Sequence, residues 1–258
     1  MMTRYEVWLN NMSLSAIDPA IYIRDIAYDA PKIMGTVSDI PGRNGQRMTD
    51  RHAQSTSVTV TVEIHEQDIR RRQNVCGRIQ MWAAKGGMLT TNDKRGQRLS
   101  VICEVPPVIT SVLKWTQVLK MVFTAYEQPF WEDEYARSVT LGGTNGNQTL
   151  YVPGIGVMTR VEANVRNVSG DTVNALTINT GASTFEFEGL ALKNGETLEI
   201  GYDENGLLYM RAGEESKMQC RTAQSDDDLM METGKNNAVS VSADRNVEVT
   251  IKARGLYM

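Results

Sequence analysis

The residue types that most often carry out chemistry in proteins are scarce in this sequence. Neither of its two histidines, His52 and His65, stands in the H-E-x-x-H spacing of a zinc-binding helix. The three cysteines, Cys76, Cys103 and Cys220, contain no C-x-x-C pair. We therefore expect His52 in a polar loop and His65 as a surface or capping residue, and we expect the cysteines to be small buried apolar side chains. No metal site and no cofactor are predicted.

Signatures of common enzyme classes are also absent from the sequence. It contains neither a G-x-S-x-G nucleophile elbow nor a G-x-x-x-x-G-K-[ST] phosphate loop. Its densest acidic cluster is Asp226, Asp227 and Asp228, which lacks the D-x-[DN]-x-[DN]-G layout of a calcium loop. We expect a solvated loop there, and the sequence leaves open whether these aspartates bind an ion. No catalytic residue is nominated, and we predict that the protein is not an enzyme.

The first part of the chain is predicted to combine several strands with one helix. Apolar and polar residues alternate over residues 57–64, the period-two pattern of a half-buried strand. The acidic segment 65–68 suits a helix N-terminus, and the helix should run to about Lys85, before Gly86 and Gly87. A hairpin of residues 88–91 and 98–105 and a strand at 116–126 are expected to follow.

The predicted helix has an apolar side that should pack on the strands. At 100° per residue this side contains Ile69, Val75, Cys76, Ile79, Trp82 and Ala83. Arg72 falls within the same arc, one turn after Asp68, with which it can form an ion pair. Two interpretations of Arg72 remain open. Its side chain can run along the core and place its charge in water, or its charge can contact another subunit. The other arginines of the helix, Arg70, Arg71 and Arg78, are expected on a solvated or partner-facing side.

The second part of the chain is predicted to contain strands and no helix. Short alternating segments recur at 149–152, 160–165, 173–178, 184–188, 197–202, 207–211, 238–242 and 247–253. Turn sequences such as Lys193-Asn194-Gly195 separate them. Strands at this spacing predict an antiparallel β-sandwich.

Composition divides the 258 residues near Tyr135. Residues 1–135 carry 16 basic and 15 acidic side chains and all four tryptophans, whereas the remainder carries 11 basic and 16 acidic side chains. We therefore expect two domains, 1–135 and 136–258. The net charge of −4 predicts no sequence-specific nucleic-acid partner. Without a signal-peptide-like run or a stretch of ~18 apolar residues, we expect no membrane partner and folding in a reducing cytoplasm.

Several segments in order resemble the distal tail proteins of siphophages, a phage tail family. The similarity begins with the Pro-Gly-x-x-Gly turn in Asp39-Ile40-Pro41-Gly42-Arg43-Asn44-Gly45, ahead of a Thr/Val-rich strand. It continues through the helix that ends in Trp82, Gly86-Gly87-Met88-Leu89 and the Asn92-Asp93 turn. It closes on the strand and Pro-Phe-Trp segment of residues 122–132. The second half resembles the family's outer domain in pattern, most clearly at residues 191–200.

This resemblance implies a mainly β fold and a structural role in a virion. The first domain, with one helix and a hairpin, would join head to tail in a hexameric ring, and the second would be an outer galectin-like antiparallel β-sandwich. The ring, single or stacked, would join the tail tube protein to the host-recognition tip. It would be assembled in the bacterial cytoplasm and lie at the tip of the virion tail. Further implied partners are a tail-associated hub or lysin protein and a receptor-binding protein.

Candidate contact residues follow from these expectations. The subunit interface is expected to involve Arg43, Asn44, Arg47, Arg70, Arg72 and Arg78. Tyr202 and Tyr209 are candidates for glycan or partner contacts, since exposed aromatic rings suit sugar stacking. The alternatives are a carbohydrate-binding module or accessory domain of a cell-wall-degrading protein, and the hub of a contractile tail or a tail-like secretion particle.

Overall fold

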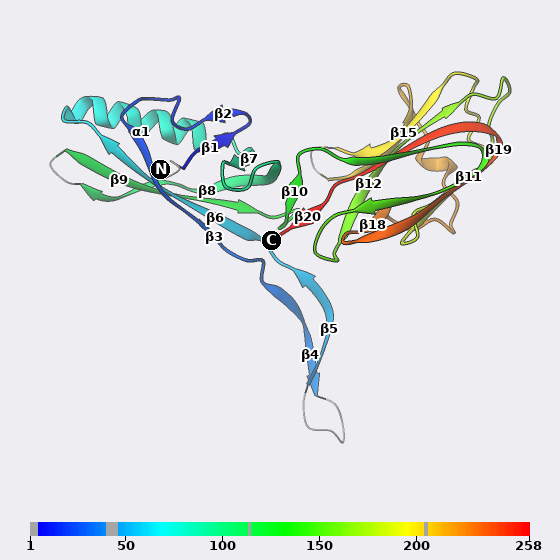
Figure 1. The fold of residues 1–258 in the computed structure, drawn as a ribbon, viewed down its shortest axis with the longest axis horizontal. Helices are drawn as coiled ribbons and strands as arrows, with labels where there is room; N and C mark the ends of the chain where they lie inside the picture. The colour runs from blue at the N-terminus through cyan, green and yellow to red at the C-terminus, as the bar shows by residue number, and fades with distance from the viewer. Residues whose placement is uncertain (1–4, 40–45, 113–114, 204–205) are drawn as a thin grey trace. The chain divides into compact units, whose positions relative to one another are not determined.

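The chain folds into two compact units. The computed structural model describes residues 5–39, 46–112, 115–203 and 206–258. The first unit comprises Met1–Glu132 with Met258, and the second comprises Asp133–Tyr257 (Figure 1). Antiparallel strands dominate both units, and α1 (Ile69–Ala83) is the one α-helix of the described residues. The predicted mainly β fold is confirmed. No described helix has the length and apolar character needed to cross a membrane.

The first unit is built on a sheet whose strands follow the order β2-β1-β7-β8-β9-β6-β3. Its strands are β1 (Val7–Leu9), β2 (Met12–Ser13), β3 (Ile21–Tyr28), β6 (Thr56–His65), β7 (Gly87–Thr91), β8 (Gln97–Val112) and β9 (Thr116–Ala125). The boundary between the units falls within β10 (Trp131–Asp133). The predicted hairpin is the antiparallel pair β7–β8. The predicted strand at 57–64 is the middle of β6, where Val58, Val60, Val62 and Ile64 are buried.

Helix α1 covers one face of this sheet. Its buried residues are Arg72, Val75, Cys76, Ile79, Trp82 and Ala83. The Trp82 ring meets the ring of Phe123 on β9 edge-on, with centroids 6.0 Å apart. Its indole N–H donates to the carbonyl of Met12 at 3.0 Å, so the polar group of this buried side chain has a hydrogen-bond partner.

Three expectations for the first unit are wrong. Ile69 is 62% exposed, because it is the first residue of α1 and lies on the flank of the apolar arc. His52, expected in a polar loop, lies in strand β5 (Gln46–Ala53), which pairs with β4 (Ile33–Asp39). Cys103 on β8 is only half-buried, as is Cys220 in the second unit, whereas Cys76 is buried as expected. None of the three cysteines forms a disulfide among the described residues.

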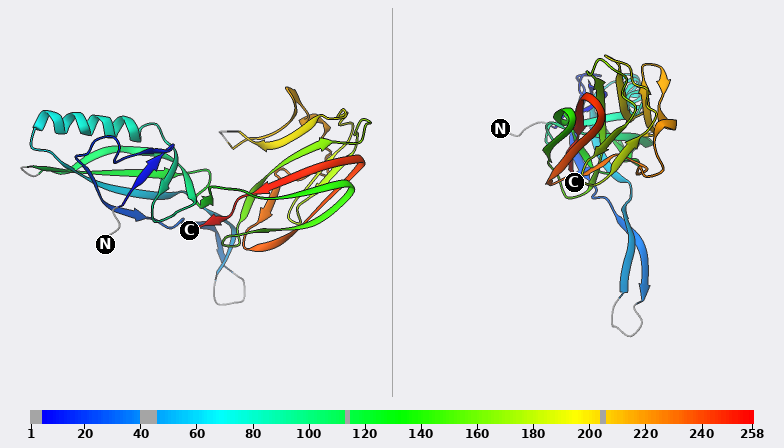
Figure 2. Two further views of the ribbon diagram at one scale, coloured as in Figure 1. Left: turned by 45° about the horizontal axis from the view of Figure 1, so that its top comes forward. Right: turned by 90° about the vertical axis from the view of Figure 1, so that its right-hand side faces the viewer.

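The β4–β5 hairpin is a separate two-stranded sheet. In Figure 1 and Figure 2 it extends away from the larger sheet of its unit, as a twisted ribbon of two strands. The register shifts between Met34 and Thr36, the kind of irregularity that twists such a ribbon. The Pro-Gly-x-x-Gly turn that contributed to the family resemblance lies outside the described residues.

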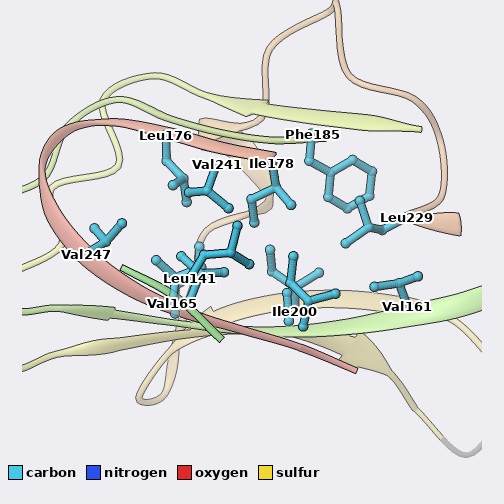
Figure 3. Packing of buried hydrophobic residues seen from close by; sticks show 14 of the residues in the cluster. Leu141, Val161, Val165, Leu176, Ile178, Phe185, Ile200, Leu229, Val241 and Val247 are labelled. Carbon is cyan, nitrogen blue, oxygen red and sulfur yellow. The ribbon is translucent and has the colours of Figure 1, made fainter. Parts of the chain in front are cut away.

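The second unit consists of two strand layers around an apolar core. Its elements are β11 (Arg137–Val152), β12 (Met158–Asn167), β13 (Leu176–Asn179), β14 (Thr184–Phe187), β15 (Thr197–Tyr202), β16 (Leu208–Ala212), β17 (Glu215–Ser216), η1 (Met218–Cys220), β18 (Met230–Glu232), β19 (Lys235–Ala253) and β20 (Leu256–Tyr257). Figure 3 shows side chains from both layers meeting between them, such as Phe185 and Ile178 on one side and Ile200 and Val165 on the other.

Strand β19 connects these layers. Its first half pairs with β13, and its second half pairs with β12. Strand β11 follows β19 along its length, with a register shift between Gly143 and Asn145 where the pair bends. The segments 238–242 and 247–253, expected as two strands, therefore belong to one continuous strand. Two layers are consistent with the predicted sandwich, and its galectin-like character stays a prediction.

Candidate interaction surfaces

The candidate interface residues of α1 are positioned by a side-chain cap at the start of the helix. The Asp68 carboxylate accepts hydrogen bonds from the main-chain N–H groups of Arg70 at 2.8 Å and Arg71 at 3.4 Å. Helix N-terminal N–H groups have no partner within the helix, so such a cap stabilises the first turn. The acidic residues noted in the sequence therefore precede α1 and do not form its first turn.

Arg72 lies on the core side of the helix. It is 5% exposed, and its main-chain N–H donates to the Asp68 carbonyl at 2.9 Å. So little exposed area leaves Arg72 scarcely any surface to offer a second subunit. Its position in the apolar arc was visible in the sequence, and its depth follows from packing against the sheet.

Arg78 and Arg71 attach the helix to the segment before β3. The Arg78 guanidinium lies 3.4 Å from the Asp18 carboxylate and also donates to the Ile17 carbonyl. Arg71 lies 3.1 Å from Glu66 and 3.9 Å from Asp18. Both arginines are thus engaged within the chain, although about half of each side chain remains exposed.

Arg70 differs from these two arginines. It is exposed, and no described carboxylate lies within 4.0 Å of its guanidinium. Arg47 pairs through its main chain with Ser38 in the β4–β5 hairpin, away from α1 in the sheet topology. Arg43 and Asn44 lie outside the described residues. The structure therefore brings together Arg70, Arg72 and Arg78 on one helix and places Arg47 on a different element.

A polar hollow at the base of the hairpin was not anticipated. It has a volume of about 580 Å³, and its lining includes Asp29, Lys32, Ser57, Glu104 and Tyr126. The Asp29 carboxylate accepts from the Ser57 hydroxyl, and the Glu104 carboxylate accepts from the Tyr126 hydroxyl. Sequence reasoning missed it because the lining residues come from several strands.

Tyr202 and Tyr209 lie on opposite faces of the β15–β16 ladder. Tyr202 pairs with Leu208, whereas Tyr209 pairs with Gly201, and paired residues point to the same side. Tyr202 lies on the core-facing side, where its hydroxyl is 3.2 Å from both the N–H and the carbonyl of Leu229. The two rings therefore cannot form a joint stacking platform.

Each of these tyrosine rings also has a guanidinium above it. Arg160 lies 4.9 Å from the centre of the Tyr202 ring, and Arg211 lies 4.9 Å from that of Tyr209. Burial, together with the nearby Asp228 carboxylate, raises the pKa of Tyr202 to about 12. A sugar stacking on either ring would compete with a cation–π contact already present.

The aspartate cluster has structural roles. Asp226 accepts from the N–H of Thr184 at 2.7 Å, and the Asp227 carbonyl accepts from Arg221 at 3.1 Å. Among the described residues no three His, Cys, Asp or Glu side chains are grouped as metal ligands would be. The loop 226–228 is exposed, which agrees with the expectation of a solvated loop.

The fold is similar to solved structures of phage tail components over nearly its whole length. The crystal structure of the Dit protein of phage SPP1, described as a paradigm of the hub adsorption apparatus in phages that infect Gram-positive bacteria, matches with a TM-score of 0.73. The match covers 98% of this chain and 99% of that chain at 9% sequence identity. Chains of the phage P2 baseplate in its activated conformation match at 8% identity, with TM-scores of 0.52 with Ca and 0.50 with Sr. These matches cover 99% and 97% of this chain and 98% and 97% of theirs.

By sequence alone, no protein-family model and no curated protein matches the chain. The structural matches extend over both units, so the resemblance to siphophage distal tail proteins is confirmed at the level of the fold.

Proposed function

We propose that this protein is a non-enzymatic component of the distal end of a phage tail, in which six copies form a ring between the tail tube and the host-recognition tip. The observation that carries the proposal is the match to the SPP1 Dit protein, which covers both units of this chain. A carbohydrate-binding module would be expected to match over the second unit alone. The separation of Tyr202 and Tyr209 on opposite faces also disfavours this alternative.

The first unit is the ring-forming part in this proposal. Its predicted range, residues 1–135, is nearly neutral, so several copies can come together without strong mutual repulsion. The solvent side of α1 and the β4–β5 hairpin are the elements with surface to offer a neighbouring copy. Arg70, Arg78 and Arg47 are carried by these elements, whereas Arg72 is buried on the core side of α1.

The second unit is the outer part, which would hold other tip proteins. Its acidic composition suits contacts with basic surfaces of a receptor-binding protein or a tail-associated hub or lysin protein. The tail tube protein is the expected partner of the ring itself. The protein would be assembled into the virion in the bacterial cytoplasm and would lie at the tip of the tail.

Projection imaging of the purified protein by negative-stain electron microscopy tests the proposal directly. We expect rings with six-fold symmetry and outer lobes, and mass photometry should give a species of about six chain masses, or twelve if rings stack. A protein that remains monomeric at micromolar concentration, with the second unit alone binding a glycan array, would favour the carbohydrate-binding alternative.

A further inference from the structure

The solvent side of α1 contains a glycine that no contact with the described residues explains. Gly77 lies in the interior of the helix, opposite the buried side, and a Cβ added there would meet no atom within 4 Å. Glycine inside a helix is about 1 kcal/mol less favourable than alanine. Since no neighbour in the described part of the chain requires a glycine here, the position suits close approach by another molecule.

The surroundings of Gly77 form a shallow, mixed surface. Arg70, Asn74, Gly77, Met81 and Ala84 follow one another at helical spacing along the solvent side. We call this stripe the helix face. A hollow of about 540 Å³ lies along it, and Met81 at its rim is 74% exposed. The helix face thus offers a small depression, a bulky apolar side chain and Arg70, whose guanidinium has no described carboxylate within 4.0 Å.

The opposite side of the same sheet has complementary features. Residues that alternate with the core-facing ones of β3, β6, β9 and β8 point away from α1 and form what we call the outer sheet face. Its apolar residues Tyr22, Ile102 and Val108 are 45%, 60% and 50% exposed.

The charges of the two surfaces are also complementary. On the outer sheet face Glu63 is paired with Arg24 at 3.3 Å, which leaves the carboxylates of Asp25 and Glu104 beside the cation of Lys120. On α1, Arg71 and Arg78 are paired with Glu66 and Asp18 and Arg72 is buried, so Arg70 is the cation that the helix face offers a partner.

We infer that the helix face of one copy packs against the outer sheet face of a second copy, with Met81 among its apolar side chains and Arg70 directed to its carboxylates. This inference rests on the proposed function, whose ring it makes specific. Because the two surfaces lie on opposite sides of one sheet, each copy uses a different surface toward each neighbour. Such a heterologous contact generates a ring or a filament and not a closed dimer.

Site-specific cross-linking tests the contact in the assembled full-length protein. A photo-reactive benzoylphenylalanine replaces Met81, and cross-linked peptides are identified by mass spectrometry. We expect cross-links between copies to residues of β3, β6, β8 or β9. Cross-links from assembled protein that map only to α1 or to the second unit would overturn the inference and leave the ring intact, whereas a wild-type protein that never assembles would overturn the ring as well.

Substitution of Gly77 provides a second, independent measurement. Gly77→Leu should fill the hollow and weaken assembly at least tenfold, the effect of about 1.4 kcal/mol in contact free energy. Gly142→Leu is the matched control, because a Cβ at this glycine of the second unit also meets nothing within 4 Å. Gly77→Ala should raise the melting temperature of the unassembled chain, which separates an effect on folding from one on assembly. Wild-type assembly by Gly77→Leu would contradict the proposed contact.

Discussion

Tyr28 and Asp93 join strand β3 to the turn between β7 and β8. The Tyr28 hydroxyl donates to the Asp93 carboxylate, with its oxygen 2.6 and 2.8 Å from the two carboxylate oxygens. Burial and this acceptor raise the pKa of Tyr28 above its usual value. Burial opposes ionisation of Asp93, but the hydrogen bonds from Tyr28 and Thr91 outweigh it and hold the Asp93 pKa below its usual value. The pair therefore stabilises the first unit when the carboxylate is charged.

Tyr28→Phe should cost about 1–2 kcal/mol in the free energy of unfolding near neutral pH, because Asp93 loses a partner. A depressed carboxyl pKa gives stability that is present above about pH 4 and is lost as pH falls through the folded-state value. The difference between wild type and variant should therefore shrink in acid. Urea unfolding followed by tryptophan fluorescence reports on this unit, since all four tryptophans lie in residues 1–132. Tyr135→Phe, at an exposed tyrosine, is the control, and a pH-independent difference would contradict the prediction.

Asp68→Ala should destabilise the first unit by about 1 kcal/mol, since the N–H groups of Arg70 and Arg71 lose their side-chain acceptor. Asp68→Asn keeps an oxygen in the same place and should retain most of the stability. The change is read from urea unfolding with tryptophan fluorescence, to which Trp82 on the same helix contributes. Equal losses in the two variants would assign the effect to charge instead of capping.

Phe187→Ala should destabilise the second unit by about 3–5 kcal/mol through a cavity in its core. Phe187 is fully buried, and its ring packs edge-on against that of Phe185 with centroids 6.3 Å apart. Hydrogen exchange measured by mass spectrometry should show faster exchange in β13, β14 and β19, while the tryptophan-reported unfolding of the first unit is unchanged. Phe187→Leu should have a smaller effect. A matching shift in the tryptophan signal would show that the units do not unfold independently.

Tyr202→Phe should reduce the loss of stability of the second unit in alkali. A tyrosine pKa raised to about 12 in the folded state gives stability that is fully present below about pH 10, the usual tyrosine pKa. This stability is lost as pH rises from there through the folded-state pKa of about 12. Wild type should therefore lose stability between these pH values more steeply than the variant, as followed by thermal melts in circular dichroism. Tyr209→Phe, on the other face of the ladder, is the matched control and should follow wild type.

Tyr209→Ala should leave glycan-array binding unchanged, because the Tyr209 ring already has the Arg211 guanidinium above it. Arg211 is itself held by Glu199 at 2.8 Å, so the ring face is not freely available. Tyr135→Ala, at a more exposed aromatic residue, serves as the control for general surface effects. Specific glycan binding by wild type that disappears in Tyr209→Ala alone would support a sugar site there.

The local periodicity of the sequence determined the elements whose burial repeats along the chain. Residues 57–64 alternate in type and became the middle of β6, and the apolar arc of residues 69–83 became the buried side of α1. These predictions succeeded because a strand or helix that covers a core needs apolar residues at a fixed spacing. The order of family-like segments likewise indicated a fold that the structural comparisons confirm.

Only the tertiary structure decided which residues meet across elements and which surfaces remain exposed. Segments 238–242 and 247–253 look like two strands, because the bend between them is polar, yet β11 pairs with both and makes them one. Tyr202 and Tyr209 look equivalent in sequence, and the β15–β16 register places them on opposite faces. Arg70, Arg72 and Arg78 differ in burial and partners because packing against the sheet and the position of Asp18 are set by contacts distant in sequence. Such long-range contacts leave no periodic signal in the chain, and they determine which side of α1 is available to a partner.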